Sequence, residues 1–210
     1  MKLQVAIDRV PFDKAENLVK IFDGLADVIE IGTSLIKDYG LFKLKELSGK
    51  KKISKLLGDI KTSDEGAYEF KQGFKQGFDI LTVMGSASLE TIEKCYEVSE
   101  QSNGVMMIDL LECSDEKIKE ISHFKNAIYC IHASIDREKL LNPGKTVEEF
   151  KERFPQVNKI AVAGGITLDC IPELNKHNIE LVIVGSAITG AENPVEKAKQ
   201  FKERIGKWEQ

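Results

Sequence analysis

Residues 159–189 read KIAVAGGITLDCIPELNKHNIELVIVGSAIT, in which an apolar run followed by glycine occurs twice, with a more polar stretch between the two copies. Both runs are rich in branched aliphatic residues and show no alternation of apolar and polar positions. This pattern is typical of strands buried on both faces of a parallel sheet. The stretch therefore predicts two consecutive strand–helix units of an α/β protein.

The same unit recurs along the whole chain, which contains eight apolar runs of strand length. They are LQVAID (3–8), DVIEIG (27–32), ISKLLGD (53–59), DILTVMG (79–85), GVMMID (104–109), AIYCIH (127–132), KIAVAGG (159–165) and ELVIVG (180–185). Between them, apolar residues recur three or four positions apart, as between Asp13 and Gly24, which is the spacing of an amphipathic helix. We predict a single (β/α)8 TIM barrel that spans residues 1–210 as one domain.

An open, doubly wound sheet is the alternative arrangement of such units. That fold would need a glycine-rich phosphate-binding turn after its first strand, but residues 6–9 read AIDR. The sequence also contains no low-complexity tract or linker that would mark a domain boundary. The closed barrel is therefore the favoured prediction.

Composition and charge exclude several classes of protein. The net charge is −4, and the 30 basic and 34 acidic residues are interspersed, so we expect no nucleic-acid partner. The first residues lack the apolar stretch of a signal peptide, and no run approaches the roughly 18 residues of a membrane span. We therefore expect a cytoplasmic protein without a membrane partner. The four cysteines form no CxxC pair, so we expect free thiols.

Charged and polar residues stand where the predicted strands end. They are Asp8, Glu30, Asp59, Lys61, Asp109 and His132, followed by Gly164, Gly165, Gly185 and Ser186 after the last two strands. In a barrel these positions meet at one end, where TIM-barrel enzymes carry their active sites. A charge at the end of an apolar strand costs free energy unless it is paired or bound to a ligand. We predict an active site there, with structural caps and ion pairs as the alternative interpretation.

The segment DIKTSD (59–64) is the strongest local motif. Asp59 and Lys61 are two residues apart on a strand, so their side chains point to the same side. Asp64 follows three residues later, near the predicted start of the third helix. An Asp–Lys–Asp array keeps the ammonium charged and fixed, so that it can stabilise an oxyanion on a substrate. For Asp64 alone, helix capping is the alternative.

Two further groups can be assigned a chemical role from their positions. Glu30 and Asp59 end neighbouring strands, which suits a hard divalent cation such as Mg²⁺, for which Mn²⁺ can substitute; a pair of hydrogen-bonded buried acids is the alternative. His132 is the one group at this end of the predicted barrel whose ordinary pKa suits proton transfer near neutral pH.

Glycine-containing turns follow the last two predicted strands. Glycine lets the backbone approach a phosphate, whose oxygens then accept hydrogen bonds from backbone N–H groups. Phosphate sites after strands seven and eight recur in TIM barrels. Gly164, Gly165, Gly185 and Ser186 are therefore predicted to bind the phosphate of a small substrate, and packing alone is the alternative reason for the glycines.

The segments VAID, IEIGTSLI, DIKTSD, IDLLECSD, IHASID, AVAGGIT and VGSAIT occur in an order that resembles the orotidine-phosphate decarboxylase superfamily. Within it, the chain most resembles the 3-hexulose-6-phosphate synthase family, from Lys2 to about Lys199. The resemblance implies a reversible aldol reaction in which formaldehyde and D-ribulose 5-phosphate form D-arabino-3-hexulose 6-phosphate. It also implies a homodimer with shared active sites.

The resemblance implies a role for each residue at the end of the predicted barrel. Glu30 and Asp59 would bind magnesium, the metal and Lys61 would stabilise a cis-enediolate, His132 would move protons, Asp8 and Asp109 would hold substrate hydroxyls, and Asp64 would reach the partner subunit's site. The sequence departs from the family pattern after the histidine, where residues 133–134 read Ala-Ser and the segment 134–146 is unusual.

Three alternative functions stay open at this point. 3-Keto-L-gulonate 6-phosphate decarboxylases share the scaffold, but they typically carry arginine at the positions of Ile135 and Ser186 in this chain. Orotidine-phosphate decarboxylase fits poorly because it needs no metal. A non-catalytic barrel that senses sugar phosphates would not require the charged Asp59–Lys61–Asp64 motif.

Overall fold

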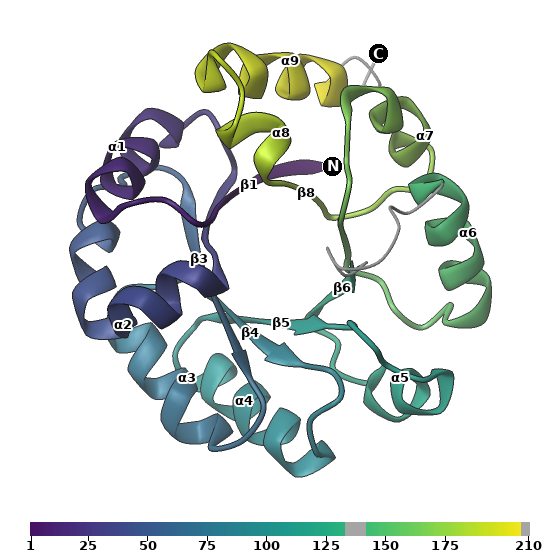
Figure 1. The fold of residues 1–210 in the computed structure, drawn as a ribbon. Coiled ribbons are helices and arrows are strands. Elements are labelled where there is room, and N and C mark those ends of the chain that lie inside the picture. Colours follow the sequence, from purple (N-terminus) through teal and green to yellow (C-terminus); the bar gives the residue numbers. More distant parts are fainter. Residues whose placement is uncertain (133–141, 207–210) are drawn as a thin grey trace.

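The computed structural model describes residues 1–132 and 142–206. The strands of this part form one closed barrel in sequence order, seen end-on as a ring in Figure 1. They are β1 (Lys2–Ile7), β2 (Val28–Ile31), β3 (Lys55–Thr62), β4 (Ile80–Met84), β5 (Val105–Asp109), β6 (Ile128–His132), β7 (Ile160–Ala163) and β8 (Leu181–Val184). Each strand overlaps one of the predicted apolar runs, so the predicted (β/α)8 barrel is confirmed.

The helices surround the ring of strands (Figure 1). They are α1 (Phe12–Phe22), α2 (Thr33–Ser48), α3 (Gly66–Lys75), α4 (Leu89–Gln101), α5 (Asp115–Ile121), α6 (Pro143–Arg153), α7 (Ile171–Asn175), α8 (Ser186–Thr189) and α9 (Pro194–Gly206), with a 3₁₀ turn η1 (Leu168–Cys170) before α7. Local sequence fixes several boundaries. The Ser114 side chain accepts a hydrogen bond from the Lys117 N–H and caps α5, and Pro194 occupies the first position of α9.

The barrel closes because β1 pairs in parallel with both β2 and β8. Ala6 lies opposite Glu30 of β2, and Val5 lies opposite Val184 of β8. All neighbouring strands are parallel, so every strand ends at the same side of the ring. Residues that follow the strands therefore converge on one end, which we call the C-terminal end of the barrel.

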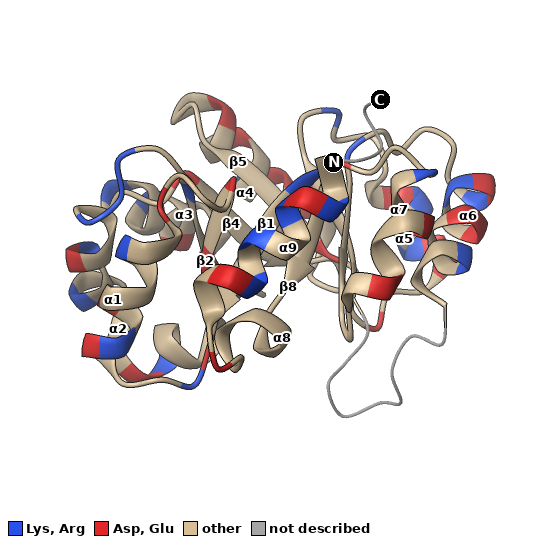
Figure 2. Cartoon of the chain, turned by 90° about the horizontal axis from the view of Figure 1, so that it is seen from above, with Lys and Arg blue, Asp and Glu red and all other residues tan. Residues whose placement is uncertain are grey.

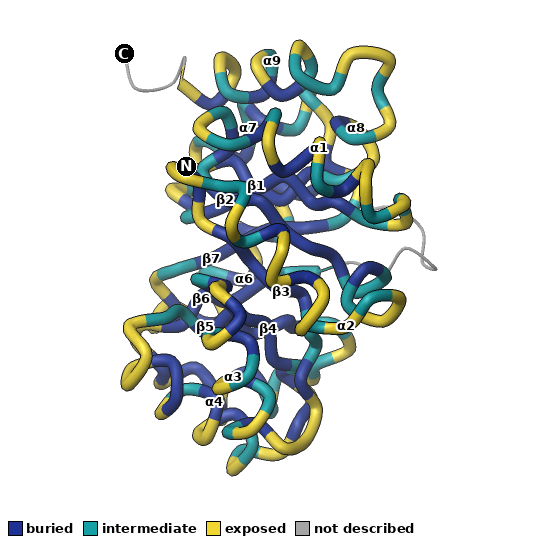
Figure 3. The backbone as a smooth tube through the Cα atoms, turned by 90° about the vertical axis from the view of Figure 1, so that its left-hand side faces the viewer, coloured by how far each residue is buried: buried dark blue, intermediate teal, exposed yellow. Residues whose placement is uncertain are grey.

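Apolar side chains form two layers of core. The larger layer lies between the sheet and the helices and contains residues such as Phe22, Phe70 and Phe201. The smaller fills the inside of the barrel, where Leu57 and Met107 are among its members. In Figure 3 the strands are almost uniformly buried, whereas the helices alternate between buried and exposed residues. Burial of each large apolar side chain contributes about 1.5–3 kcal/mol, so the strands form a rigid platform.

β3 differs from its predicted form at its C-terminal end. The strand continues to Thr62, and its pairing with β4 shifts register between Gly58 and Thr62. Within this irregular stretch Lys61 has a φ of 48°, a left-handed conformation that costs a residue other than glycine roughly 1–3 kcal/mol. The Lys61 N–H donates to the Thr82 hydroxyl at 2.9 Å, so β4 holds this conformation in place.

Charged residues of the two signs are not segregated along the helices. Basic and acidic residues alternate on them in the cartoon of Figure 2. Lys51 lies in the turn between α2 and β3 and pairs with Asp79. All four cysteines are free thiols. Within residues 1–132 and 142–206, no helix combines the length and apolarity that a membrane span requires.

Candidate active site

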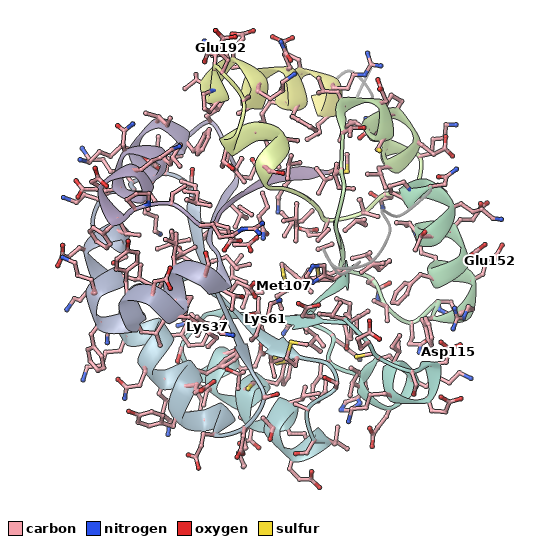
Figure 4. All side chains as sticks on the ribbon, viewed as in Figure 1. Lys37, Lys61, Met107, Asp115, Glu152 and Glu192 are labelled. Carbon is pink, nitrogen blue, oxygen red and sulfur yellow. The ribbon has the colours of Figure 1, made fainter. Side chains whose placement is uncertain are left out.

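A cavity of about 550 Å³ opens at the C-terminal end of the barrel. Nine of the predicted site residues line it, namely Asp8, Glu30, Asp59, Lys61, Asp109, His132, Gly164, Gly185 and Ser186. Figure 4 shows Lys61 and Met107 toward the middle of the ring, whereas Glu152 lies on its outer edge. Strands separated by up to about 180 residues in the sequence therefore contribute to one site.

Two of the predicted residues do not line this cavity. Asp64 is exposed, and its carboxylate accepts a hydrogen bond from the Glu65 N–H at 2.8 Å. It is not the N-cap of α3 either, because Glu65 occupies that position. Gly165 has a φ of 64°, and its neighbour Gly164, which does line the cavity, has a φ of 101°. Both are conformations that glycine adopts readily.

Lys61 lies between two carboxylates. Its ammonium nitrogen is 3.3 Å from Asp59 Oδ2 and 2.5 Å from Asp109 Oδ2. Burial by itself lowers the pKa of Lys61, but the two carboxylates outweigh this effect and raise the pKa above its ordinary value. The side chain therefore stays charged. Within this chain, the predicted Asp–Lys–Asp array is completed by Asp109 and not by Asp64.

Asp109 also orients His132. The His132 Nδ1 atom lies 3.0 Å from Asp109 Oδ2 and 3.1 Å from Oδ1. Burial raises the pKa of Asp109, but the bond from His132 and the charge of Lys61 lower it to about 2. An ionised carboxylate can only accept hydrogen bonds, so Nδ1 carries the hydrogen in this pair. The other ring nitrogen, Nε2, takes no part in this contact with Asp109.

Asp59 is held by two hydroxyl groups. Thr33, at the start of α2, donates to Oδ2 at 2.6 Å, and Thr82 on β4 donates to Oδ1 at 2.7 Å. Both threonines line the cavity as well. Because each carboxylate oxygen has a donor, Asp59 has a fixed orientation beside Lys61.

Glu30 is the least compensated charge of the site. It is only 8% exposed, and Gln4 Nε2 donates to its Oε2 at 2.6 Å. Burial, together with the nearby Asp59 carboxylate, raises the pKa of Glu30 to about 8. The other atom of the amide, Gln4 Oε1, is buried and has no hydrogen-bond partner among the described residues. Two crowded acids and an unpartnered amide oxygen fit a hard cation, which prefers oxygen ligands.

This set falls short of a complete protein-made metal site. In the part of the chain that the structure describes, no group of three or more histidine, cysteine, aspartate or glutamate side chains is arranged to hold a metal. A divalent cation at Glu30 and Asp59 would therefore need water or substrate oxygens to complete its coordination, as is usual for Mg²⁺.

Asp8 has a structural bond in addition to its place in the cavity. Its Oδ1 accepts hydrogen bonds from the Ser34 N–H at 3.2 Å and the Ser34 hydroxyl at 2.6 Å. These bonds tie the end of β1 to the first turn of α2. A Cβ at Gly32 would lie 2.1 Å from Asp8 Oδ2, so glycine is required there for this contact. One Asp8 oxygen is thus engaged before any substrate binds.

The remaining part of the cavity wall comes from the turns after β7, β8 and β1. Gly164, Gly185 and Ser186 lie in these turns and line the cavity. Thr189 and Gly190 of the α8 segment and two basic residues, Arg9 and Lys14, line the cavity beside them.

Comparison with known proteins agrees with this geometry. The chain matches the orotidine 5'-phosphate decarboxylase / HUMPS family over residues 1–201. It belongs to that family. A 3-hexulose-6-phosphate synthase of Bacillus subtilis (strain 168) is 34% identical over 98% of this chain and 99% of its own. One of Staphylococcus aureus (strain MSSA476) is 32% identical over the same shares.

Solved structures show the same relationship. A crystal structure of a 3-hexulose-6-phosphate synthase aligns with a TM-score of 0.89 at 30% identity, over 98% of this chain and 100% of that one. The enzyme of that name from Salmonella typhimurium aligns with a TM-score of 0.89 at 25% identity, over 99% and 100% of the two chains. These relatives support an enzyme of the lyase or aldolase type that acts on a sugar phosphate.

The sequence analysis did not identify several residues of the cavity wall. They are Gln4, Arg9, Lys14, Thr33, Ser34 and Thr82. Two of them had a usable signal: Gln4 and Thr82 are polar residues inside runs that are otherwise apolar. The other four lie in turns and at helix starts, where polar residues are common for local reasons.

Proposed function

We propose that this protein catalyses the reversible aldol condensation of formaldehyde with D-ribulose 5-phosphate to give D-arabino-3-hexulose 6-phosphate. The observation that carries the proposal is the charged cluster of Asp59, Lys61, Asp109 and His132 beside the buried Glu30. It lies in a chain that is 34% identical, over nearly its full length, to a 3-hexulose-6-phosphate synthase.

The cluster contains the two functions that this reaction requires. Removal of a proton from C1 of ribulose 5-phosphate gives an enediolate, whose C1 then attacks the carbonyl carbon of formaldehyde. The Lys61 ammonium, fixed by two carboxylates, stabilises the negative charge on the enediolate oxygen. His132 is oriented through Nδ1 by Asp109. Its Nε2 accepts the proton that leaves C1 and later donates it to the new alkoxide.

We also propose that Glu30 and Asp59 bind Mg²⁺, or Mn²⁺ in its place, next to the Gln4 amide that donates to Glu30. A bound cation supplies positive charge to oxygens that become negative in the transition state. We expect EDTA to abolish activity and added Mg²⁺ or Mn²⁺ to restore it. After EDTA has been removed, titration of the metal-free protein with Mn²⁺, followed by electron paramagnetic resonance, measures metal binding directly. Full activity in EDTA would remove the metal from the proposal.

The decisive assay compares two substrates. Ribulose 5-phosphate with formaldehyde is expected to give hexulose phosphate, and 3-keto-L-gulonate 6-phosphate is expected to release little or no carbon dioxide. The reverse result would make the chain a decarboxylase on the same scaffold. Binding of pentulose phosphate without turnover of either substrate, in the presence of magnesium, would favour a sensor.

We propose a homodimer in which Asp64 completes the partner's site. Asp64 is exposed and lies outside its own cavity, and the neighbouring Tyr68 is 59% exposed, so this surface is available to a second copy. Lys61→Ala and Asp64→Ala homodimers should each be nearly inactive. Random mixing makes about half of the dimers hybrids, each with one intact site, so about a quarter of wild-type activity should return.

The mixing experiment needs its own control. Mass spectrometry of differently tagged subunits establishes that exchange has taken place. Exchange without recovered activity would show that Asp64 does not act across a subunit boundary.

A further inference from the structure

Two basic side chains of the cavity wall are unpaired. Arg9 and Lys14 both line the 550 Å³ cavity, and neither side chain makes a hydrogen bond or ion pair within the described residues. Lys61, the other lysine of this wall, is bound to two carboxylates. Arg9 and Lys14 are exposed residues of the cavity wall, and no described group of the protein neutralises their positive charge.

Their position places this charge beside the last turns of the barrel. Because Val5 of β1 lies opposite Val184 of β8, the chain that continues past β1 runs next to the chain that continues past β8. A Cβ at Gly185 would lie 3.9 Å from the Cβ of Ala6, which shows how closely the two segments approach. Arg9 follows on one of these segments and Ser186 on the other.

The unpaired cations of the cavity consequently come from other elements than its main acid cluster, whose one lysine, Lys61, is held by two carboxylates. Glu30, Asp59 and Asp109 come from β2, β3 and β5, whereas Arg9 and Lys14 come from the turn after β1 and from α1. Asp8 is the acid closest in sequence to Arg9, and its Oδ1 is occupied by Ser34. A substrate with an anionic group at one end fits this division in one orientation only.

The backbone of Arg9 is held in an unusual conformation. Its φ is 50°, in the left-handed region that residues other than glycine rarely adopt. The Arg9 N–H donates to the Ser34 hydroxyl at 2.7 Å, and the same hydroxyl donates to Asp8 at 2.6 Å. The Ser34 hydroxyl, itself bonded to Asp8, thus fixes the backbone from which the Arg9 side chain extends.

We propose that Arg9 and Lys14 bind the phosphate group of the substrate and so set the direction in which the substrate lies. This inference rests on the proposed function, which supplies a phosphorylated substrate. The turns after β7 and β8 read GGIT (164–167) and GSAITG (185–190) and contain no basic residue. They offer backbone N–H groups and hydroxyls, while a phosphate dianion also favours cations, above all the planar guanidinium of arginine.

The proposal predicts a loss that depends on the substrate's phosphate. Arg9→Gln and Lys14→Gln should each lower kcat/KM for ribulose 5-phosphate about 10-fold, and the double variant about 100-fold, the scale of one and two charged hydrogen bonds. For unphosphorylated D-ribulose with formaldehyde, kcat/KM should stay the same. Arg9→Lys keeps the charge and should recover part of the loss.

A matched control separates a local contact from a change in net charge. Lys125 is exposed and precedes β6, at the opposite end of the barrel. Lys125→Gln removes the same charge and should leave kcat/KM for both substrates unchanged. An equal loss in Lys125→Gln and Arg9→Gln would overturn the proposal, because the effect would then be long-range.

Calorimetric titration with inorganic phosphate tests the site without any turnover. The wild type should bind phosphate, and the double variant should bind it at least about 10-fold more weakly. If the wild type does not condense the two substrates but shows this difference in phosphate binding, the proposed function fails and the phosphate site stands. If condensation proceeds while the double variant keeps the wild-type preference for phosphorylated substrate, the function stands and the assignment of Arg9 and Lys14 is wrong.

Discussion

The two ends of the barrel contain the same kinds of charged residue, but they differ in whether these charges have partners of opposite sign. Each end has a cavity, of about 550 Å³ at the C-terminal end and about 420 Å³ at the N-terminal end. Around the N-terminal cavity every acid has a basic partner, in the pairs Lys2–Glu180, Lys51–Asp79 and Lys202–Asp27. At the C-terminal end, Glu30 has no basic partner and Arg9 and Lys14 have no acidic one within the described residues.

The pKa values show what this difference means. Burial raises the pKa of Asp79 at the N-terminal end, but Lys51 and the Leu56 N–H outweigh it and lower the pKa. Glu30 has the opposite shift, to about 8. An acid whose pKa falls on folding stabilises the protein at neutral pH, and one whose pKa rises destabilises it. Asp79 at the N-terminal end thus stabilises the fold, whereas Glu30 at the C-terminal end destabilises it until a ligand compensates its charge.

The largest expected effect is on turnover at the C-terminal end. Lys61→Ala should lower kcat at least ~100-fold, because one electrostatic group at a developing oxyanion contributes on that scale. Lys51→Ala is the matched control, since Lys51 also pairs with an aspartate but at the other end. It should leave kcat unchanged. If Lys61→Ala is unfolded by circular dichroism, the Asp59–Lys61–Asp109 cluster is a structural network.

Glu30→Gln should separate stability from activity. In EDTA, the raised pKa makes Glu30 reduce the free energy of unfolding as pH increases from about 4.5 to about 8. The variant should lose this part of the pH dependence and be more stable than wild type at pH 8 by about 1–2 kcal/mol. Urea unfolding at pH 5 and pH 8 measures the difference. Added Mg²⁺ should stabilise the wild type and not the variant; equal stability at both pH values would place Glu30 in an ordinary, compensated environment.

Asp79→Asn tests the opposite end. Asp79 accepts from the Leu56 N–H at 2.8 Å and from Lys51, so its neutralisation should lower the free energy of unfolding by about 1–2 kcal/mol and leave turnover intact. Its lowered pKa makes this contribution present above pH 3.8 and lost as pH falls through the folded-state pKa. Wild type and variant should therefore converge in stability on acidification. A loss of turnover in the folded variant would break the division between the two ends.

The sequence predicted the barrel well because each strand can be recognised from its own consecutive residues. Each apolar run is a continuous signal, and the observed strands begin and end within a few residues of it. The presence of charged residues at the C-terminal end was equally readable. Their pairing could not be predicted. Lys61 forms its ion pair with Asp109, 48 positions away. This contact depends on the left-handed backbone of Lys61 and on the register shift in β3, and neither has a local sequence signal. The hydrogen bonds from Thr33 and Thr82 to Asp59 also join distant positions, so the sequence gives no sign of them.

The smallest expected effect concerns the most exposed ion pair of the N-terminal end. Lys2 and Glu180 are 2.7 Å apart, but their side chains are 59% and 34% exposed. Water and salt screen such a pair, so Lys2→Met should change the free energy of unfolding by no more than about 0.5 kcal/mol. Urea unfolding in low and high salt measures this change, and high salt should make it vanish. Asp79 differs from Glu180 because its carboxylate also accepts from a backbone N–H, so Asp79→Asn should cost more. If Lys2→Met proves the more costly, surface ion pairs and not backbone contacts stabilise this end of the barrel.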